Sequence, residues 1–254
     1  MDVPASPAVT SRRPLALALN RAAYRVCRYW IAFLILGGGA LVALPWLAPV
    51  FMKVGWTSAG RGVYTAYSFV CHQLPQRSFF LFGPKPMLSL EDVLRAGAGS
   101  RDPFSLRQFV GTPQVGYKVG WSDRMVSMYS SIPLAALAWW ALRKRIKPLP
   151  VWGFVLFTLP IVLDGASHTL SDFAGIGMGF RDSNLWLSTL TGGSLPTWVY
   201  AGDAFGSFNS WMRLITGALF GIGLVWFAFA PLGEAFDDLA REFEAKFARA
   251  GVRP

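Results

Sequence analysis

Ile31-Ala-Phe-Leu-Ile-Leu-Gly37-Gly38-Gly39 belongs to an apolar stretch that extends from about Tyr29 to Phe51. A helix needs about 20 predominantly apolar residues to cross the hydrocarbon core of a bilayer, and this stretch is long enough. Three more apolar stretches follow, at about residues 125–142, 151–163 and 211–230. The third is short, so we expect it to continue past Asp164 or to start near Lys147. The sequence therefore predicts an all-α fold, a polytopic membrane helical bundle with about four transmembrane helices.

The composition also indicates a membrane protein. Hydrophobic residues make up 53% of the 254 residues and charged residues only 15%, and the mean hydropathy is +0.39. A soluble domain would carry about 25% charged residues. A net charge of +10 would suggest nucleic acid in a soluble protein, but basic residues that flank membrane segments serve to fix topology. We therefore expect the lipid bilayer as a partner, and no nucleic acid.

Basic residues are distributed unevenly around the predicted spans. The loop between the third and fourth spans, residues 164–210, contains a single basic residue, Arg181. Basic residues gather instead before the first span and between the second and third: Arg12, Arg13, Arg21, Arg25 and Arg28, then Arg143, Lys144, Arg145 and Lys147. The positive-inside rule then places both termini in the cytoplasm. This predicts a multi-pass protein of a prokaryotic cytoplasmic (inner) membrane, with external loops at 52–124 and 164–210.

The chain divides into a basic cytoplasmic segment (1–28), a membrane domain (29–231) and a C-terminal segment (232–254). In the last segment, apolar residues recur at the spacing of an amphipathic helix: Leu232, Phe236, Leu239, Phe243 and Phe247. This cytoplasmic helix could pack on the bundle or the membrane interface, or it could dock a membrane-protein partner or a second copy of the chain. Its polar face is mainly acidic, which argues against simple adhesion to anionic lipid.

The external loops are long for structureless connections. We therefore expect short helices in them that lie on or re-enter the outer face. The clearest is predicted at residues 88–96, because Ser89 can cap it and Glu91-Asp92 would lie in its first turn.

The polar run Cys71-His72-Gln73-Leu74-Pro75-Gln76-Arg77-Ser78 lies between apolar segments and contains one of two cysteines and one of two histidines. A thiolate and an imidazole suit zinc, copper or iron, and a Cys beside His or Arg could also be an activated thiol. Alternatively, Cys71 is a small packing residue and His72 bonds to a backbone carbonyl. Cys27 is predicted on the opposite side of the membrane, which excludes a Cys27–Cys71 disulfide within one chain.

A second polar segment contains the other histidine. Asp164, His168 and Asp172 are spaced i, i+4, i+8, so they share one face of a helix. A carboxylate one turn from an imidazole orients it and raises its basicity. Since both histidines are predicted on the outer side, we expect Cys71, His72, Asp164 and His168 to meet in an extracytoplasmic metal or redox site. Alternatively, the two aspartates cap helix ends and His168 bonds to the loop.

Further polar residues are predicted to surround this site: Gln73, Arg77, Arg124, Asp172 and Arg181. Each arginine could bind a carboxylate or phosphate bidentately, or it could form a buried ion pair with an aspartate of the same chain. In the fourth span, Gly217-x-x-x-Gly221 predicts a close approach of two helices.

Five different short motifs occur between the first external loop and the fourth span. They are Cys71-His72-Gln73 with Arg77-Ser78-Phe79, Arg124 with Tyr129, Asp164-Gly165, Arg181-x-Ser183-Asn184 and Thr216-Gly217. In these motifs, over roughly residues 63–221, the chain resembles an uncharacterised prokaryotic integral membrane family, domain of unknown function 2085. Members usually have Cys at the position of Ser122 and Gln at that of His168. The resemblance implies that an external disulfide or metal pair of the family is lost here, with His168 as a replacement ligand or the site degenerate. It implies no reaction.

Two classes of function follow from the sequence. The first is a membrane protein with an extracytoplasmic metal or redox site. The second is a non-catalytic accessory or scaffold subunit of a larger membrane complex. An oligomeric small-solute transporter is a third and weaker class of function. No span centre carries an unpaired charge of the kind that marks a substrate path.

Overall fold

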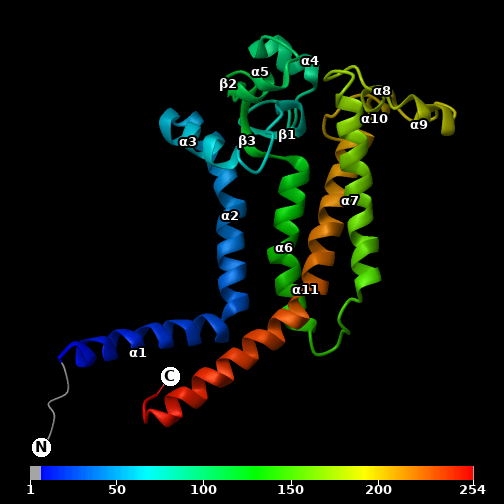
Figure 1. Ribbon diagram of the computed structural model, residues 1–254. Helices are drawn as coiled ribbons and strands as arrows, with labels where there is room; N and C mark the ends of the chain where they lie inside the picture. The colour runs from blue at the N-terminus through cyan, green and yellow to red at the C-terminus, as the bar shows by residue number, and fades with distance from the viewer. Residues whose placement is uncertain (1–6, 254) are drawn as a thin grey trace, which may run out of the picture.

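The computed structural model describes residues 7–253, with side chains from residue 14 onward. Residues 1–6 of the predicted N-terminal segment and residue 254 of the tail lie outside the described residues. Four helices are long and apolar enough to cross a membrane: α2 (Trp30–Lys53), α6 (Asp123–Leu142), α7 (Val151–Asp172) and α11 (Phe208–Arg249). They run alongside one another in Figure 1. The predicted all-α bundle of four membrane helices is confirmed.

The third and fourth spans differ from the predicted ranges. The third continues past Asp164 as far as Asp172, one of the two alternatives. The fourth span and the amphipathic tail form one helix of 42 residues, with Pro231 inside it. The tail is therefore a continuation of α11 rather than a separate element, and Figure 1 shows this half of α11 running away from the bundle.

Glycines allow α11 to pack tightly between α6 and α7. A Cβ added at Gly221 would overlap the side chain of Ser131 and lie 2.6 Å from the carbonyl oxygen of Met128, both in α6. A Cβ at Gly217 would lie 2.9 Å from the carbonyl oxygen of Arg124. The Gly217-x-x-x-Gly221 motif thus faces α6 at a distance that leaves no room for a larger residue.

The α11 tail packs on the N-terminal part of the same chain. Helix α1 (Pro7–Arg28) precedes α2 and meets its N-terminal end at a sharp angle. It lies beside the C-terminal end of α11 (Figure 1). The Tyr24 hydroxyl donates to Glu244 Oε1 at 2.9 Å, and its ring packs edge-on against Phe247. The ring of Phe236 stacks on Trp30 with centroids 5.2 Å apart. Part of the tail's apolar face is therefore covered within the chain.

The loop between α2 and α6 folds into a small domain, residues 57–122, which we call the sheet domain. It contains a three-stranded antiparallel sheet in the order β1-β3-β2, which the sequence did not predict. Ser89 caps α4 as expected, in a capping box with Asp92. The elements are α3 (Thr57–Tyr67), the 3₁₀ turn η1 (Pro75–Arg77), β1 (Ser78–Leu81), α4 (Leu90–Val93), the π turn η2 (Leu94–Ala98), α5 (Pro103–Gln108), β2 (Gly111–Thr112) and β3 (Gly116–Ser122).

The loop between α7 and α11 contains three short helices, α8 (Phe180–Ser183), α9 (Leu185–Leu190) and α10 (Thr197–Tyr200). In Figure 1 they project sideways at the end of the bundle that carries the sheet domain. We call this the sheet-domain end. Residues that lie far apart in the sequence meet here.

Candidate functional site

Buried and half-buried charged side chains from six segments connect the sheet domain to the membrane helices. They form ion pairs in which four arginines face four aspartates, so the formal charge of the group is zero. We call this group the clamp. Its members are Arg77 (η1), Asp123 and Arg124 (α6), Asp164 and Asp172 (α7), Arg181 (α8), Asp203 (before α11) and Arg213 (α11).

The first half of the clamp joins the sheet domain to α7 and α11. Arg77 binds Asp172 bidentately, at 2.7 and 2.8 Å, and its Nε donates to Asp203 Oδ2 at 2.8 Å. Arg213 donates to the other Asp203 oxygen at 2.6 Å and to both oxygens of Asp123 at 2.8 to 3.0 Å. Asp203 is thus the bridge between two arginines.

The second half joins α6, α7 and α8 around Asp164. Its Oδ2 accepts from Arg124 and its Oδ1 from Arg181, both at 2.7 Å. The remaining guanidinium nitrogens of Arg181 donate to Ser167 Oγ at 3.1 Å and Asn209 Oδ1 at 3.0 Å. Each Asp164 oxygen therefore has a cationic donor, and Arg181 carries the contact on to α11.

Ion pairing decides the charge state of Asp203. Burial on its own would raise the pKa of this carboxyl, but the nearby charges of Arg77 and Arg213 outweigh it and hold the pKa well below its usual range. Asp203 therefore stays ionised. A buried ion pair of this kind adds little net stability over apolar packing, but removal of one partner is costly because it leaves a bare buried charge.

Cys71 lies in an aromatic cluster with Tyr67 and Trp121. Its sulfur accepts from the backbone N–H groups of Gln73 and Ser122 at 3.4 Å, and the Ser122 hydroxyl is 3.6 Å away. The thiol is buried. Both Cys27 and Cys71 are free. These contacts are those of a packing residue.

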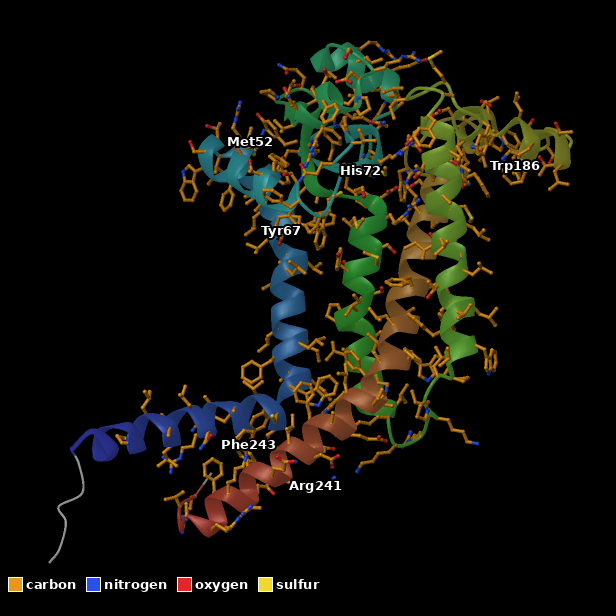
Figure 2. All side chains as sticks on the ribbon, viewed as in Figure 1. Met52, Tyr67, His72, Trp186, Arg241 and Phe243 are labelled. Atoms are coloured by element: carbon orange, nitrogen blue, oxygen red, sulfur yellow. The ribbon has the colours of Figure 1, made fainter. Side chains whose placement is uncertain are left out.

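The two histidines have different surroundings. His72 is exposed at the sheet-domain end (Figure 2), and its Nδ1 accepts from the Leu74 N–H at 3.3 Å; it does not donate to a carbonyl through that nitrogen. His168 is buried with Nε2 3.2 Å from Arg181 Nη2. Since a guanidinium can only donate, His168 accepts through Nε2 and carries its proton on Nδ1.

The predicted metal ligands are not assembled into one site. Among the side chains that the structure describes, residues 14–253, no group of three or more His, Cys, Asp or Glu is arranged to hold a metal ion. Asp164 and His168 are close, with Oδ1 and Nε2 3.9 Å apart, but arginines occupy the carboxylate. Four of the five residues predicted to surround the site, Arg77, Arg124, Asp172 and Arg181, belong to the clamp. Gln73 lies apart from it, bound to Tyr64 and Lys118.

Sequence reasoning missed Asp203 and Arg213 as members of the clamp. Arg213 could have been recognised as a member of a polar network, because an arginine at the start of an apolar span needs a partner. Asp203 had little to mark it, since its partners, Arg77 and Arg213, can be recognised only once the loops are folded.

Comparison with known proteins adds little. No family model matches the chain, and no solved structure matches it. One similar protein is an uncharacterized protein of Methanocaldococcus jannaschii, 48% identical over 44 residues. The match covers 15% of this chain and 28% of that protein, so the aligned part is about a quarter of the relative's length.

Proposed function

We propose that this chain is a non-catalytic scaffold or accessory subunit of a membrane complex. In this role the clamp holds the sheet domain in a fixed position on the transmembrane helices. The observation that carries the proposal is the charge balance of the clamp. Each of its four aspartates is bound by at least one arginine side chain.

This arrangement is unfavourable for the alternative functions. A cation at Asp164 would have to displace Arg124 and Arg181 and would be repelled by both. A redox role for Cys71 would need an accessible thiol, and this one is buried in an aromatic cluster. A transporter path is usually marked by available charges in the spans, whereas Arg213 is fully engaged by Asp123 and Asp203.

The distribution of basic residues supports a sheet domain outside the cytoplasm, with both termini inside. The tail of α11 then offers a cytoplasmic contact surface. Leu232 and Leu239 remain 41% and 43% exposed on it, although neighbouring apolar side chains pack on α1 and α2.

Purification from native membranes in mild detergent tests the proposal. We expect the 27.9 kDa chain to migrate in a stoichiometric complex that is free of bound transition metal. The double variant Leu232→Glu, Leu239→Glu should release the partner. Glu234→Gln, also on the tail, is the control and should retain it.

Two results would contradict the scaffold role. One is a chain that purifies alone under these conditions. The other is a stoichiometric transition metal that is retained by wild type and lost in His168→Ala or Cys71→Ala.

A further inference from the structure

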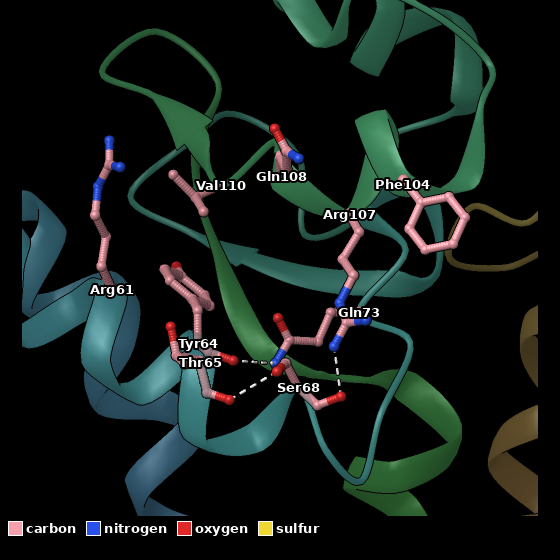
Figure 3. A pocket seen from close by; sticks show the side chains of 9 residues that line it. All are labelled: Arg61, Tyr64, Thr65, Ser68, Gln73, Phe104, Arg107, Gln108 and Val110. Atoms are coloured by element: carbon pink, nitrogen blue, oxygen red, sulfur yellow. Dashed lines mark hydrogen bonds between the residues drawn. The ribbon is translucent and has the colours of Figure 1, made fainter.

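A cleft opens in the sheet domain on the side of α3 and α5, away from the clamp. It has a volume of about 650 Å³ and is lined by residues of α3, α5 and the segments after each. Figure 3 shows Arg61 at one side, Phe104 and Arg107 at the other, and Gln73 between them. Pockets that bind small molecules in proteins are about 300–1,000 Å³, so the cleft has the size of a ligand site.

The cleft is cationic. Its lining includes Arg61 and Arg107, and none of its nine lining residues is acidic. Arg107 donates to the backbone carbonyl of Ser68, and Arg61 is exposed at the rim. Within the described residues, neither arginine forms an ion pair. This contrasts with the clamp, where each arginine has a carboxylate.

A third cation lies directly behind the lining. Lys118 is fully buried, and its Nζ donates to the carbonyl oxygens of Gln73 at 2.9 Å and Arg107 at 2.6 Å. Among residues 14–253 no carboxylate pairs with it. Burial lowers the pKa of Lys118 to about 7. The positive charge of Arg107 also lowers this pKa, whereas the nearby Cys71 acts to raise it. A buried cation without a counter-ion is costly, and an anion in the adjacent cleft would offset that cost.

The backbone at the floor of the cleft is strained. Gln73 has φ +53°, in the left-handed region that residues other than glycine rarely adopt. The side-chain Nε2 of Gln73 donates to the Tyr64 carbonyl at 2.8 Å, and the backbone carbonyl of Gln73 accepts from Lys118 Nζ. Residues held in such conformations concentrate at ligand sites. Gln73 belongs to the Cys71-His72-Gln73 run, which the sequence marked as unusual.

We propose that this cleft binds an anionic ligand whose carboxylate or phosphate groups meet Arg61 at one side and Arg107 at the other. Phe104, 74% exposed at the edge of the cleft, would cover an apolar part of the same ligand. The planar guanidinium group of an arginine can donate two parallel hydrogen bonds to two oxygens of a carboxylate or phosphate. The site is separate from the clamp and goes beyond the scaffold role, so it stands whether or not a protein partner is found.

Calorimetric titration of the full chain in nanodiscs of zwitterionic lipid tests this, with inorganic phosphate and citrate as probes. We expect at least one probe to bind. Arg61→Gln should weaken that binding about tenfold or more, as expected for loss of one charge-assisted contact. Arg107→Gln should have a similar effect. Arg101→Gln removes the same charge from the same domain outside this cleft and should leave the affinity unchanged.

A parallel preparation in phosphatidylglycerol nanodiscs identifies the source of the oxyanion. If the ligand is a lipid headgroup, phosphatidylglycerol should be retained on detergent extraction by wild type and Arg101→Gln but lost from Arg61→Gln. The proposal is overturned if neither probe binds and phosphatidylglycerol is not retained, or if Arg61→Gln and Arg101→Gln behave alike. The Arg61 side chain donates to no other residue among those described, so its variant should fold even if Arg107→Gln does not.

Discussion

Asp203, like Asp164, is shared by two arginines of the clamp, and its replacement should be strongly destabilising. Asp203→Asn would leave Arg77 and Arg213 with one carboxylate partner each in a buried site. We expect a loss of about 3–5 kcal/mol in the free energy of unfolding, as for other broken buried ion pairs. Unfolding in mixed micelles, followed by tryptophan fluorescence, measures it.

The control for Asp203→Asn is Asp238→Asn. Asp238 pairs with Arg241 on the exposed part of the α11 tail, where solvent screens the charges and the ion pair contributes little to stability. Equal effects of the two substitutions would show that the clamp is not the stabilising contact we describe. The contribution of Asp203 should also depend on pH. Because its pKa is lower in the folded protein, the stabilisation is present above about pH 4, the pKa of an unfolded aspartate, and is lost as the pH falls through the folded pKa.

Lys118 predicts a pH dependence of the same sign as that of Asp203, but in a higher pH range. Its pKa is about 7 in the folded protein against 10.5 ordinarily, so between these values the unfolded chain binds a proton that the folded chain does not. Stability should therefore rise as the pH increases from about 7 to 10. In Lys118→Met this rise should be smaller. Lys85→Met, at an exposed lysine, should follow wild type; a Lys118→Met profile parallel to wild type would contradict the assignment.

Ser122 occupies a position where a cysteine could reach Cys71. The Ser122 hydroxyl lies 3.6 Å from the Cys71 sulfur, across 51 residues of sequence. Ser122→Cys should therefore form a disulfide on oxidation, and closing a loop of that length can stabilise a protein by about 4 kcal/mol. A gel shift on reduction and a mass decrease of two hydrogens detect the bond. Ser131→Cys, further along α6, should stay reduced, and failure of Ser122→Cys to oxidise would contradict the geometry.

At the scale of elements, the contact between α6 and α11 depends on glycine. A methyl group at Gly221 would meet Ser131 and the Met128 carbonyl, so Gly221→Ala must separate the helices. We expect it to lower the thermal unfolding temperature in detergent. Gly37→Ala in α2 is the matched control, because no atom lies within 4 Å of the added methyl and alanine favours helix. Similar effects of the two changes would rule out a close α6–α11 contact.

The spans could be predicted because length and apolarity are local properties. The Ser89 cap of α4 was equally local. The sheet was missed because its strands are only two to seven residues long and pair across a long loop. The continuity of α11 was missed because the apolar span and the amphipathic tail differ in pattern, whereas one helix continues through both.

The site could be predicted only in part. The sequence marked Asp164, His168, Arg77, Arg124 and Arg181 as polar groups near the membrane that needed partners. It could not pair them, because contacts such as Arg213 with Asp123 span 90 residues. The expected shared metal site depended on that pairing, and in the structure the arginines occupy the carboxylates instead.

At the scale of the whole molecule, the clamp joins the sheet domain to α7 and α11, while aromatic contacts such as Trp46 with Phe79 join it to α2. The membrane helices are held by apolar and glycine contacts, whereas the sheet domain has its own apolar core around Leu88, Val93 and Leu106. Arg77 is the residue that the sheet domain contributes to the clamp. The attachment of the sheet domain to α7 and to the segment before α11 should therefore depend on this side chain.

Hydrogen–deuterium exchange of the full chain in nanodiscs, comparing wild type with Arg77→Gln, tests this most directly. We predict faster exchange in residues 74–82 and 172–207 on both sides of the broken contacts, with α6 and the membrane part of α11 still protected. Arg95→Gln, at an exposed arginine of the same domain, should match wild type. Unchanged exchange in Arg77→Gln would contradict the claim that the clamp fixes the sheet domain to the bundle.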